Sequence, residues 1–327
     1  MHLPFGLGLF WRDNESIQLG FDEARSAVLD GLYPAEVPLL GLLSRPCTLT
    51  DVLAWARGAG VDASRAKKIF QWVADTGLAV TDTHPARMAP CEFAAASRAG
   101  EVDPSARAEI GVRILGAGLI GSVCALLLDA EGIGAVQIED RHPLTGSQSR
   151  WLGATHIGEP IDQVLRPRLR GGGQPSRRIT LSVSSRIIPR ALAAECLAED
   201  EPYLPIVIGE SDITIGPFFF PGGPCHNCLD FHRRDADPSW PFLHTQATRL
   251  PGIEPDSTAA LISAAWACSE IIELATHPYP RLMASQLHLP PPPGWPRVTE
   301  VSVHGECGCQ IGGEAAGEHT EGANRAD

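Results

Sequence analysis

Two cysteine pairs that lie far apart in the sequence place the strongest constraint on the fold of this chain. Cys225 and Cys228 flank two residues in PGGPCHNCLD, and Cys307 and Cys309 follow near the end in HGECGC. A thiolate pair on a tight turn, together with a second and distant pair, is a common way to build a four-coordinate structural zinc site. We therefore predict that these four cysteines bind zinc and so join two distant segments.

Two alternatives to this zinc site remain open. Only Gly308 separates the cysteines of the second pair, and His304 lies three residues before Cys307, so its imidazole can replace one thiolate. The other alternative is two reduced pairs without a metal. A disulfide framework is not expected, because the nine cysteines are an odd number and the other five are scattered.

Composition favours a soluble, cytoplasmic protein. The first residues show no basic region and no long apolar stretch, so we expect no signal peptide. We also expect no run of about twenty apolar residues and hence no membrane span. The length of 327 residues suggests two domains, or one large domain with an appendage. A net charge of −13 disfavours nucleic acid as a partner, because phosphate backbones attract basic surfaces.

Residues 1–82 have the pattern of a small α+β winged-helix domain. Short apolar runs at 9–11, 17–19 and 27–29 alternate with turn-like segments and predict three strands. Three helices should follow: one opened by Pro34, one capped by Thr48 with Asp51, and one capped by Asp62 that ends at Gly77. Through residue 85 there are seven Lys and Arg against ten Asp and Glu, which argues against DNA binding and a role as a transcription factor.

Peptide capture is another use of such a domain. An extended peptide can add a strand to an exposed sheet edge while its side chains rest on the neighbouring helix. We therefore predict a peptide site that combines the third strand with exposed positions of the third helix, namely Ala27, Val28, Leu29, Lys67, Lys68 and Gln71. The simpler interpretation of Lys67 and Lys68, the only lysines of the chain, is a solvated helix face.

A Rossmann-type nucleotide fold is predicted for residues 109–310, after a linker at 83–108. The strand IGVRIL leads into Gly116, Gly118 and Gly121 and an apolar helix, and the next strand, AVQIED, ends at Asp140. The glycines can bring backbone amides to a phosphate, and Asp140 can accept a hydrogen bond from a ribose hydroxyl. The alternative is that the glycines serve only the turn and the helix packing. The Gly-, Glu- and Ala-rich residues 311–327 are expected to be disordered.

With zinc cysteines after a Rossmann half, residues 109–310 resemble the ThiF and ubiquitin-activating superfamily, most specifically in GPFFFPGGPCHNCLDFHRRDADPSW. The whole chain resembles a subgroup from peptide natural-product clusters, in which a PqqD-like winged helix precedes a ThiF-like domain. This resemblance implies that the winged helix binds the leader of a ribosomal precursor peptide. It also implies delivery of that peptide to a YcaO-type cyclodehydratase that forms azoline rings. Homodimers are common in the superfamily, so the resemblance also leaves open that this chain forms a homodimer.

The resemblance also shows where ATP chemistry is missing. Active members adenylate a peptide C-terminus with ATP and Mg²⁺, and they carry an Asp where this chain has His142, a lysine near 157–160, and a magnesium-binding Asp where Ser184 and Ser185 stand. Arg150 is the only candidate for the family's catalytic arginine, displaced by about one position. Because cations and a magnesium ligand stabilise the triphosphate, we predict a pseudoenzyme that keeps the fold and zinc. The alternatives are an active adenylyltransferase and, from the glycines alone, a nicotinamide-dependent dehydrogenase.

Several other polar residues have simpler interpretations. His226, His232 and His244 follow the first cysteine pair, and residues 232–237 suggest either an acid–base site or a charged turn beside the metal, of which we favour the turn. Cys196 and Cys268 lie in apolar helical segments, so buried inert thiols are favoured over thioester-forming nucleophiles.

Overall fold

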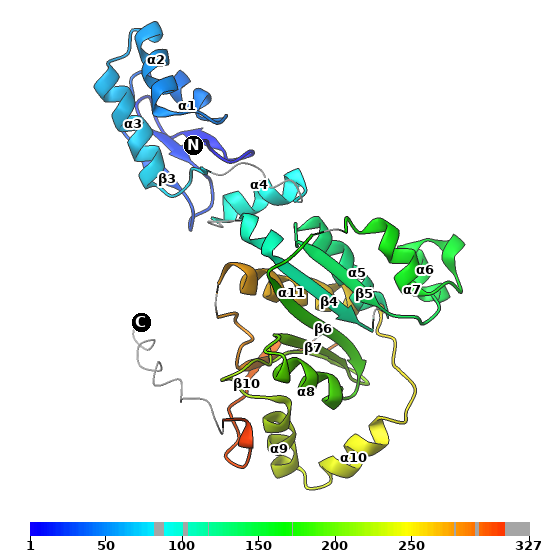
Figure 1. The fold of residues 1–327 in the computed structure, drawn as a ribbon. Helices are drawn as coiled ribbons and strands as arrows, with labels where there is room; N and C mark the ends of the chain where they lie inside the picture. Colours follow the sequence, from blue (N-terminus) through cyan, green and yellow to red (C-terminus); the bar gives the residue numbers. More distant parts are fainter. Residues whose placement is uncertain are drawn as a thin grey trace. The chain divides into compact units, whose positions relative to one another are not determined.

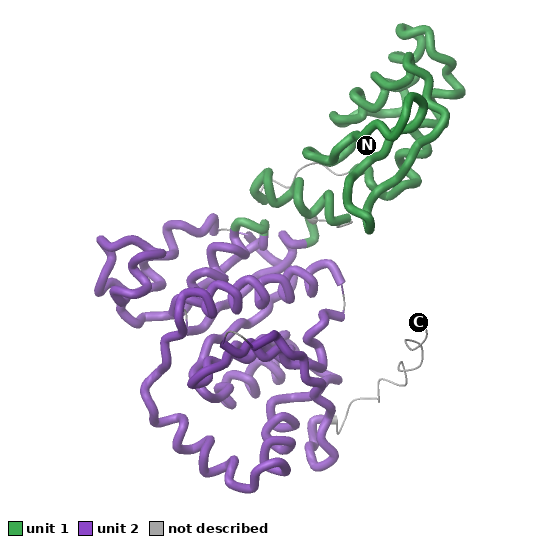
Figure 2. The backbone as a smooth tube through the Cα atoms, turned by 180° about the vertical axis from the view of Figure 1, so that it is seen from behind, with its two compact units in different colours: residues 1–106, 130–132 green, residues 107–129, 133–327 purple. Residues whose placement is uncertain are grey.

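The computed structural model describes residues 1–81, 88–100, 104–116, 118–171, 173–277, 279–291 and 294–310. The chain divides into two compact units, one of residues 1–106 with 130–132 and one of residues 107–129 with 133–327 (Figure 2). Each unit is described below by itself. The predicted tail at 311–327 and residues 83–87 of the predicted linker lie outside the described residues.

The first unit contains a three-stranded antiparallel sheet whose strands have the predicted bounds. Strands β1 (Leu9–Trp11), β2 (Ile17–Leu19) and β3 (Ala27–Leu29) lie in the order β1-β2-β3, so β1 and β3 are its edges. The apolar side chains of β2 are buried in a core that they share with the helices. This core contains, among others, Leu19, Leu39, Leu40, Leu43, Val52, Ala56, Ala66, Ile69 and Val73.

Two helices of the first unit begin at the predicted caps, whereas the first begins at Val37 and not at the predicted Pro34. Helix α1 (Val37–Leu42) has a proline in its first turn, and α2 (Leu49–Ala59) starts with the capping box of Thr48 and Asp51. The Asp62 carboxylate accepts a hydrogen bond from the Arg65 amide and caps α3 (Ala63–Asp75). Helix α4 (Pro90–Ala99) and a 3-10 turn (Pro104–Glu109) fall within the predicted linker. These elements fit a winged helix, and that domain assignment stays a prediction.

The second unit is a mixed seven-stranded sheet with helices on both faces (Figure 1). Its order is β10-β9-β8-β7-β6-β4-β5, and the first four strands in sequence run parallel. They are β4 (Ile110–Leu115), β5 (Ala135–Glu139), β6 (Arg177–Ser185) and β7 (Tyr203–Ile208). The antiparallel extension consists of β8 (Ile213–Ile215), β9 (Ser285–Leu289) and β10 (Arg297–Glu300). The predicted α/β class is therefore confirmed.

Alternate residues of β7 enter two different cores. Leu204, Ile206 and Ile208 pack with α5 (Gly118–Ala130) and α11 (Ser257–Thr276), whereas Tyr203 and Val207 pack with α8 (Arg190–Ala198) and α9 (His226–Ala236). The period of two residues along a strand explains this division. The sheet thus separates α5 and α11 from α8 and α9 and fixes where the loops at its carboxyl edge emerge.

Two expectations about the second unit were wrong, and one helix was not predicted. Residues 232–236 belong to helix α9, not to a charged turn, because Cys225 and the residues after it start a helix. Helix α10 (Trp240–Ala247) had no strong apolar period and was not predicted. The sequence RVTEVSVHG predicts a last strand over 297–305, but β10 ends at Glu300, one residue before Val301, whose amide donates to the Ala284 carbonyl at 2.8 Å.

Helix α11 corrects the expectation about membrane-length segments. By length and composition alone, its twenty residues could cross a membrane. The sequence predicts a long helix over 258–275, which α11 confirms, and its apolar run is interrupted by Ser, Thr and Glu. Its buried side includes Ala260, Ala264, Ala267 and Ile271, which pack into the core of the second unit, as in the core helix of a globular domain. Two further helices, α6 (Gly146–Leu152) and α7 (Ile161–Leu165), lie in the segment that connects β5 with β6.

Candidate functional site

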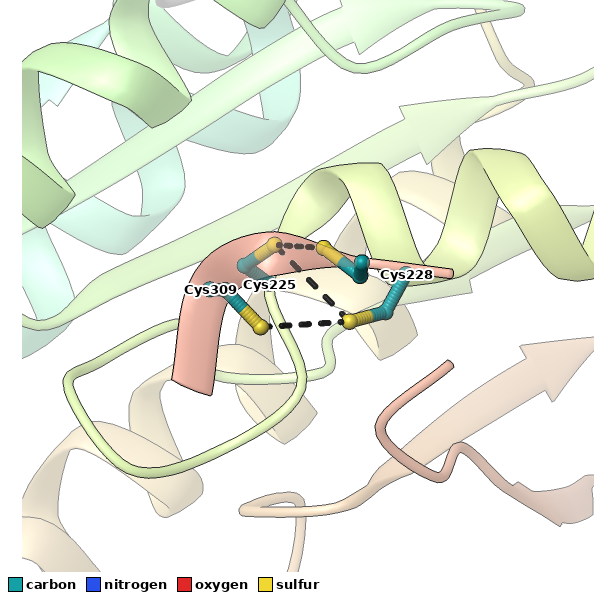
Figure 3. Close-up of side chains that lie close together, drawn as sticks. Cys225, Cys228 and Cys309 are labelled. Atoms are coloured by element: carbon teal, nitrogen blue, oxygen red, sulfur yellow. Dashed lines mark hydrogen bonds between the residues drawn. The ribbon is translucent and has the colours of Figure 1, made fainter. Parts of the chain in front are cut away.

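The structure brings the four predicted cysteines together from two distant segments of the second unit. Cys225 and Cys228 lie at the start of α9, and Cys307 and Cys309 lie beyond β10. Their sulfur atoms all lie within 4.8 Å of one another. The Cys225–Cys228 distance is 3.8 Å, and the Cys225–Cys307 and Cys228–Cys309 distances are both 3.5 Å. Figure 3 shows the thiols of Cys225, Cys228 and Cys309 turned toward one another.

These distances fit a tetrahedral metal site. With a metal–sulfur bond of about 2.3 Å, neighbouring thiolates around zinc should be about 3.8 Å apart. Burial raises the pKa of the Cys225 thiol to about 11 and also raises the pKa of Cys309, whereas burial at Cys228 is outweighed by hydrogen bonds, which lower its pKa. A divalent cation would stabilise all four groups as thiolates. The residues present therefore fit a structural metal ion, which would join the start of α9 to the C-terminal segment.

His304 belongs to the surroundings of the cluster. Its Nε2 lies 2.8 Å from Asp235 Oδ2, and its Nδ1 accepts a hydrogen bond from the Glu306 amide at 3.1 Å. Both ring nitrogens are thus engaged, which leaves the four thiols as the ligand set. The His304 ring also lies against His232, whose Nε2 hydrogen-bonds to the Ser302 carbonyl oxygen at 2.9 Å. These contacts dock the C-terminal segment onto α9.

The predicted nucleotide motif forms the turn between β4 and α5. Gly116 and Gly118 both have positive φ, of 75° and 43°, which favours glycine. A side chain at Gly116 would collide with the Val183 carbonyl oxygen of β6, and one at Gly121 would come within 2.9 Å of the Gly116 oxygen. The first and third glycines are therefore required by packing alone, whereas a β-carbon at Gly118 would meet no atom within 4 Å.

The Asp140 carboxylate accepts hydrogen bonds from residues at and near this turn. Its Oδ2 accepts a hydrogen bond from the Gly118 amide at 3.3 Å. Its Oδ1 accepts from the His142 amide at 2.8 Å and lies 2.7 Å from His142 Nδ1. The carboxylate is largely buried, whereas the His142 side chain is 88% exposed. The acid predicted to meet a ribose thus holds the glycine turn and the following loop together.

A loop before α11 covers the carboxyl edge of the parallel strands. We define residues 249–256 as the strap. The Ile253 amide donates to Ser185 Oγ at 2.9 Å, and Arg186 donates to the Pro251 carbonyl at 2.8 Å. Glu254 accepts hydrogen bonds from Ser147 Oγ at 2.8 Å, Gln148 Nε2 at 3.2 Å and Thr145 Oγ1 at 3.3 Å. Sequence patterns gave no signal for Glu254, because its partners lie more than a hundred residues away.

The space left beside the glycine turn is small. A cavity of about 70 Å³ lies between Gly118, Ser147, Gln148 and the strap, and Glu254 is the only charged residue among those that line it. Ser184 and Ser185, which stand where the resembled family has a magnesium ligand, serve loop contacts, since Ser184 donates to the Ile187 carbonyl at 2.7 Å. Arg150 is exposed on α6 and is not among the lining residues. The cavity therefore offers no lysine or arginine for a triphosphate among its lining residues.

Each of the other predicted histidines packs against a neighbouring ring. His226 packs against Phe219, His232 against His304 and His244 against Trp240. Cys196 is buried, and burial raises the pKa of its thiol, as expected for an inert side chain. Cys268 is buried as well, with its sulfur 3.8 Å from the Cys124 carbonyl oxygen.

The predicted peptide site lies at one edge of the first unit. Lys67, Lys68 and Gln71 occupy exposed positions of α3. Ala27 and Leu29 pack against the core to which α3 contributes. In an antiparallel sheet, alternate residues of a middle strand form backbone hydrogen bonds with the strands on either side. Ile17 and Leu19 of β2 therefore bond to Leu29 and Ala27, and Val28 directs its backbone N–H and C=O toward the free edge.

Comparisons with known proteins support the fold. No protein-family profile matches the chain, and no curated protein matches it. Among solved structures, E. coli MccB with ATP is similar over 94% of this chain and 98% of its own, at 13% identity and a TM-score of 0.64. The microcin C7 biosynthetic enzyme MccB with N-formylated MccA gives the same coverages, 14% identity and a TM-score of 0.61. A heterocyclase solved with substrate and cofactor matches 94% of this chain but 39% of its own, at 15% identity and a TM-score of 0.65. The chain therefore has the ThiF-like fold of MccB, as the motifs predicted.

Proposed function

We propose that this chain binds the leader of a ribosomally made precursor peptide and presents the peptide to a YcaO-type cyclodehydratase. In this proposal it takes part in thiazole- and oxazole-forming peptide biosynthesis in the cytoplasm and performs no ATP chemistry itself. The observation that supports it most is the combination of a MccB-like fold with a glycine-turn cleft closed by Glu254. MccB has been solved with MccA, and the heterocyclase with its substrate, which supports a peptide partner.

The leader peptide would add a strand to β3. Val28 presents its backbone at the free edge, and Lys67, Lys68 and Gln71 line the exposed side of α3. Main-chain hydrogen bonds would then supply affinity, and the α3 side chains would supply selectivity. The four-cysteine site is proposed to hold zinc in a purely structural role. It keeps the C-terminal segment on α9 and takes no part in chemistry.

An active adenylyltransferase is the second candidate. The three glycines keep the geometry of a phosphate-binding turn, and MccB has been solved with ATP. Two differences argue against it. No lysine lies near 157–160, and serines stand where a carboxylate is expected at the end of β6, although a triphosphate needs both cations and a magnesium ligand.

The proposal is tested with the precursor encoded closest to this gene. Its synthetic leader, labelled with a fluorophore, should bind the protein, and Val28→Pro should weaken binding at least about tenfold because proline removes the outward amide. The YcaO-type protein from the same locus should then remove one water per ring only when this chain is present. Ring formation at an unchanged rate without it, or leader binding unaffected by Val28→Pro, would contradict the proposal.

A further inference from the structure

The opposite edge of the small sheet, strand β1, is apolar and exposed. Leu9, Phe10 and Trp11 are 38%, 40% and 53% exposed, and they are consecutive. Natural edge strands are usually protected by a charged residue, a proline or a bulge, because an open edge invites pairing with another chain. Strand β1 is short, which is itself one form of protection, but it has no charged residue and no proline among its three residues. An edge of this kind is suited to receive another strand.

The backbone of β1 is arranged for such pairing. The Gly8 carbonyl accepts from the Gly20 amide at 2.9 Å, and the Arg12 amide donates to the Ser16 carbonyl at 3.0 Å. Between them, Phe10 lies opposite Gln18. Since every second residue of an antiparallel strand bonds to the same neighbour, Leu9 and Trp11 direct their N–H and C=O groups away from β2. These two residues offer four main-chain groups to an added strand.

A groove runs beside this edge, between β1 and α1. Its volume is about 510 Å³. It is lined by apolar side chains and one glycine: Leu9, Trp11, Ile17, Pro34, Val37, Pro38, Leu40 and Gly41. No charged residue lines it, so a charged side chain would lose its hydration there without gaining a partner. The groove therefore selects for an uncharged, apolar occupant.

The size of this surface favours a short peptide over a second copy of the chain. The exposed parts of the three β1 side chains amount to on the order of 250 Å², given that a large side chain buries roughly 150–250 Å² in full. A stable interface between globular partners needs about 800 Å² on each side. One added strand, by contrast, combines main-chain hydrogen bonds with a few side chains in pockets.

We propose that β1 and the groove beside α1 bind an extended peptide segment that is uncharged and has large apolar side chains at alternating positions. The segment pairs with Leu9 and Trp11, and every second side chain enters the groove, as the period of a strand requires. This docking site is distinct from the β3 edge, and it does not depend on the function proposed above.

The test uses the full-length protein and a short fluorescein-labelled peptide that alternates threonine with leucine. Gly41→Leu should fill the groove without disturbing the fold, because a β-carbon there meets no atom within 4 Å and leucine favours a helix over glycine. Leu9→Pro should block the ladder while keeping β2 paired. Each substitution should weaken binding at least about tenfold in fluorescence anisotropy.

Matched controls separate the two sheet edges. Gly58→Leu places the same side chain at an equally open helical glycine of α2, and it should bind the probe within about twofold of the wild type. Val28→Pro should also retain probe binding, although it should weaken leader binding at β3. Absence of probe binding to the wild type, or unchanged binding by Gly41→Leu, would overturn the proposal. So would loss of probe binding in Val28→Pro alone, or a concentration-dependent dimer that Gly41→Leu dissociates.

Discussion

Ser185, at the end of β6, accepts a hydrogen bond from the backbone amide of Ile253 at 2.9 Å. Parallel strands of a nucleotide-binding sheet place their ligand contacts at this carboxyl edge. Here a serine at that position holds the strap, and Glu254 of the strap accepts three further hydrogen bonds from Thr145, Ser147 and Gln148. The edge that would receive a nucleotide is thus occupied by the chain's own loop.

The strap should loosen when the Glu254 carboxylate is removed. Glu254→Ala deletes hydrogen bonds to a charged group, which are worth about 1.5–3 kcal/mol each. We expect trypsin to cleave after Arg249 at least about tenfold faster in this variant, and the melting temperature of the protein to fall as well. Cleavage at the wild-type rate would contradict the role assigned to Glu254. Glu195→Ala is a suitable control, because Glu195 is an exposed acid that pairs with Arg113, a residue of β4 and not of the strap.

The purified protein should contain one zinc ion per chain. Cys228→Ser should abolish metal binding and lower the free energy of unfolding by on the order of 4 kcal/mol, since the metal joins two distant segments. Cys91→Ser serves as the control, because Cys91 is an exposed free thiol outside the cluster and its loss should alter neither quantity. Metal content would be measured by atomic emission and stability by urea unfolding. A wild type that is stable and free of metal would exclude the structural site.

Acid should destabilise the fold through buried histidines. Burial lowers the pKa of His244 and of His288 below the usual 6.5. The unfolded chain takes up protons near pH 6.5 while the folded chain does not, so this contribution to stability is complete above pH 6.5 and is lost as the pH falls below it. Urea unfolding at pH 7.5 and 5.5 should show a smaller pH-dependent loss in His244→Gln than in the wild type. Equal losses would show that His244 does not contribute.

Local sequence patterns predicted much of the architecture. The three short strands of the first unit, the caps Thr48 and Asp62, and the turn from β4 into α5 follow from turn residues, caps and glycine spacing, which act within a few residues. The cysteine pairs were also found from spacing, because metal ligands must come as near neighbours on a turn.

The features that sequence reasoning missed depend on contacts between distant residues. Helix α10 is short and has no clear period of apolar residues, so local patterns did not predict it. Its first residue, Trp240, is held by a hydrogen bond from the indole nitrogen to Asp230. The position of Glu254 depends on residues of α6 that are more than a hundred positions earlier. The engagement of Asp140 by Gly118 and His142 likewise could not follow from a motif that is shared with nucleotide-binding chains.

The absence of ATP chemistry is the central claim, and calorimetric titration of the zinc-loaded protein with Mg-ATP tests it most directly. The closed cleft at Gly118 and the lack of a magnesium ligand at Ser184 and Ser185 predict no detectable heat of binding. Binding with a micromolar dissociation constant would contradict this account and would favour an active adenylyltransferase.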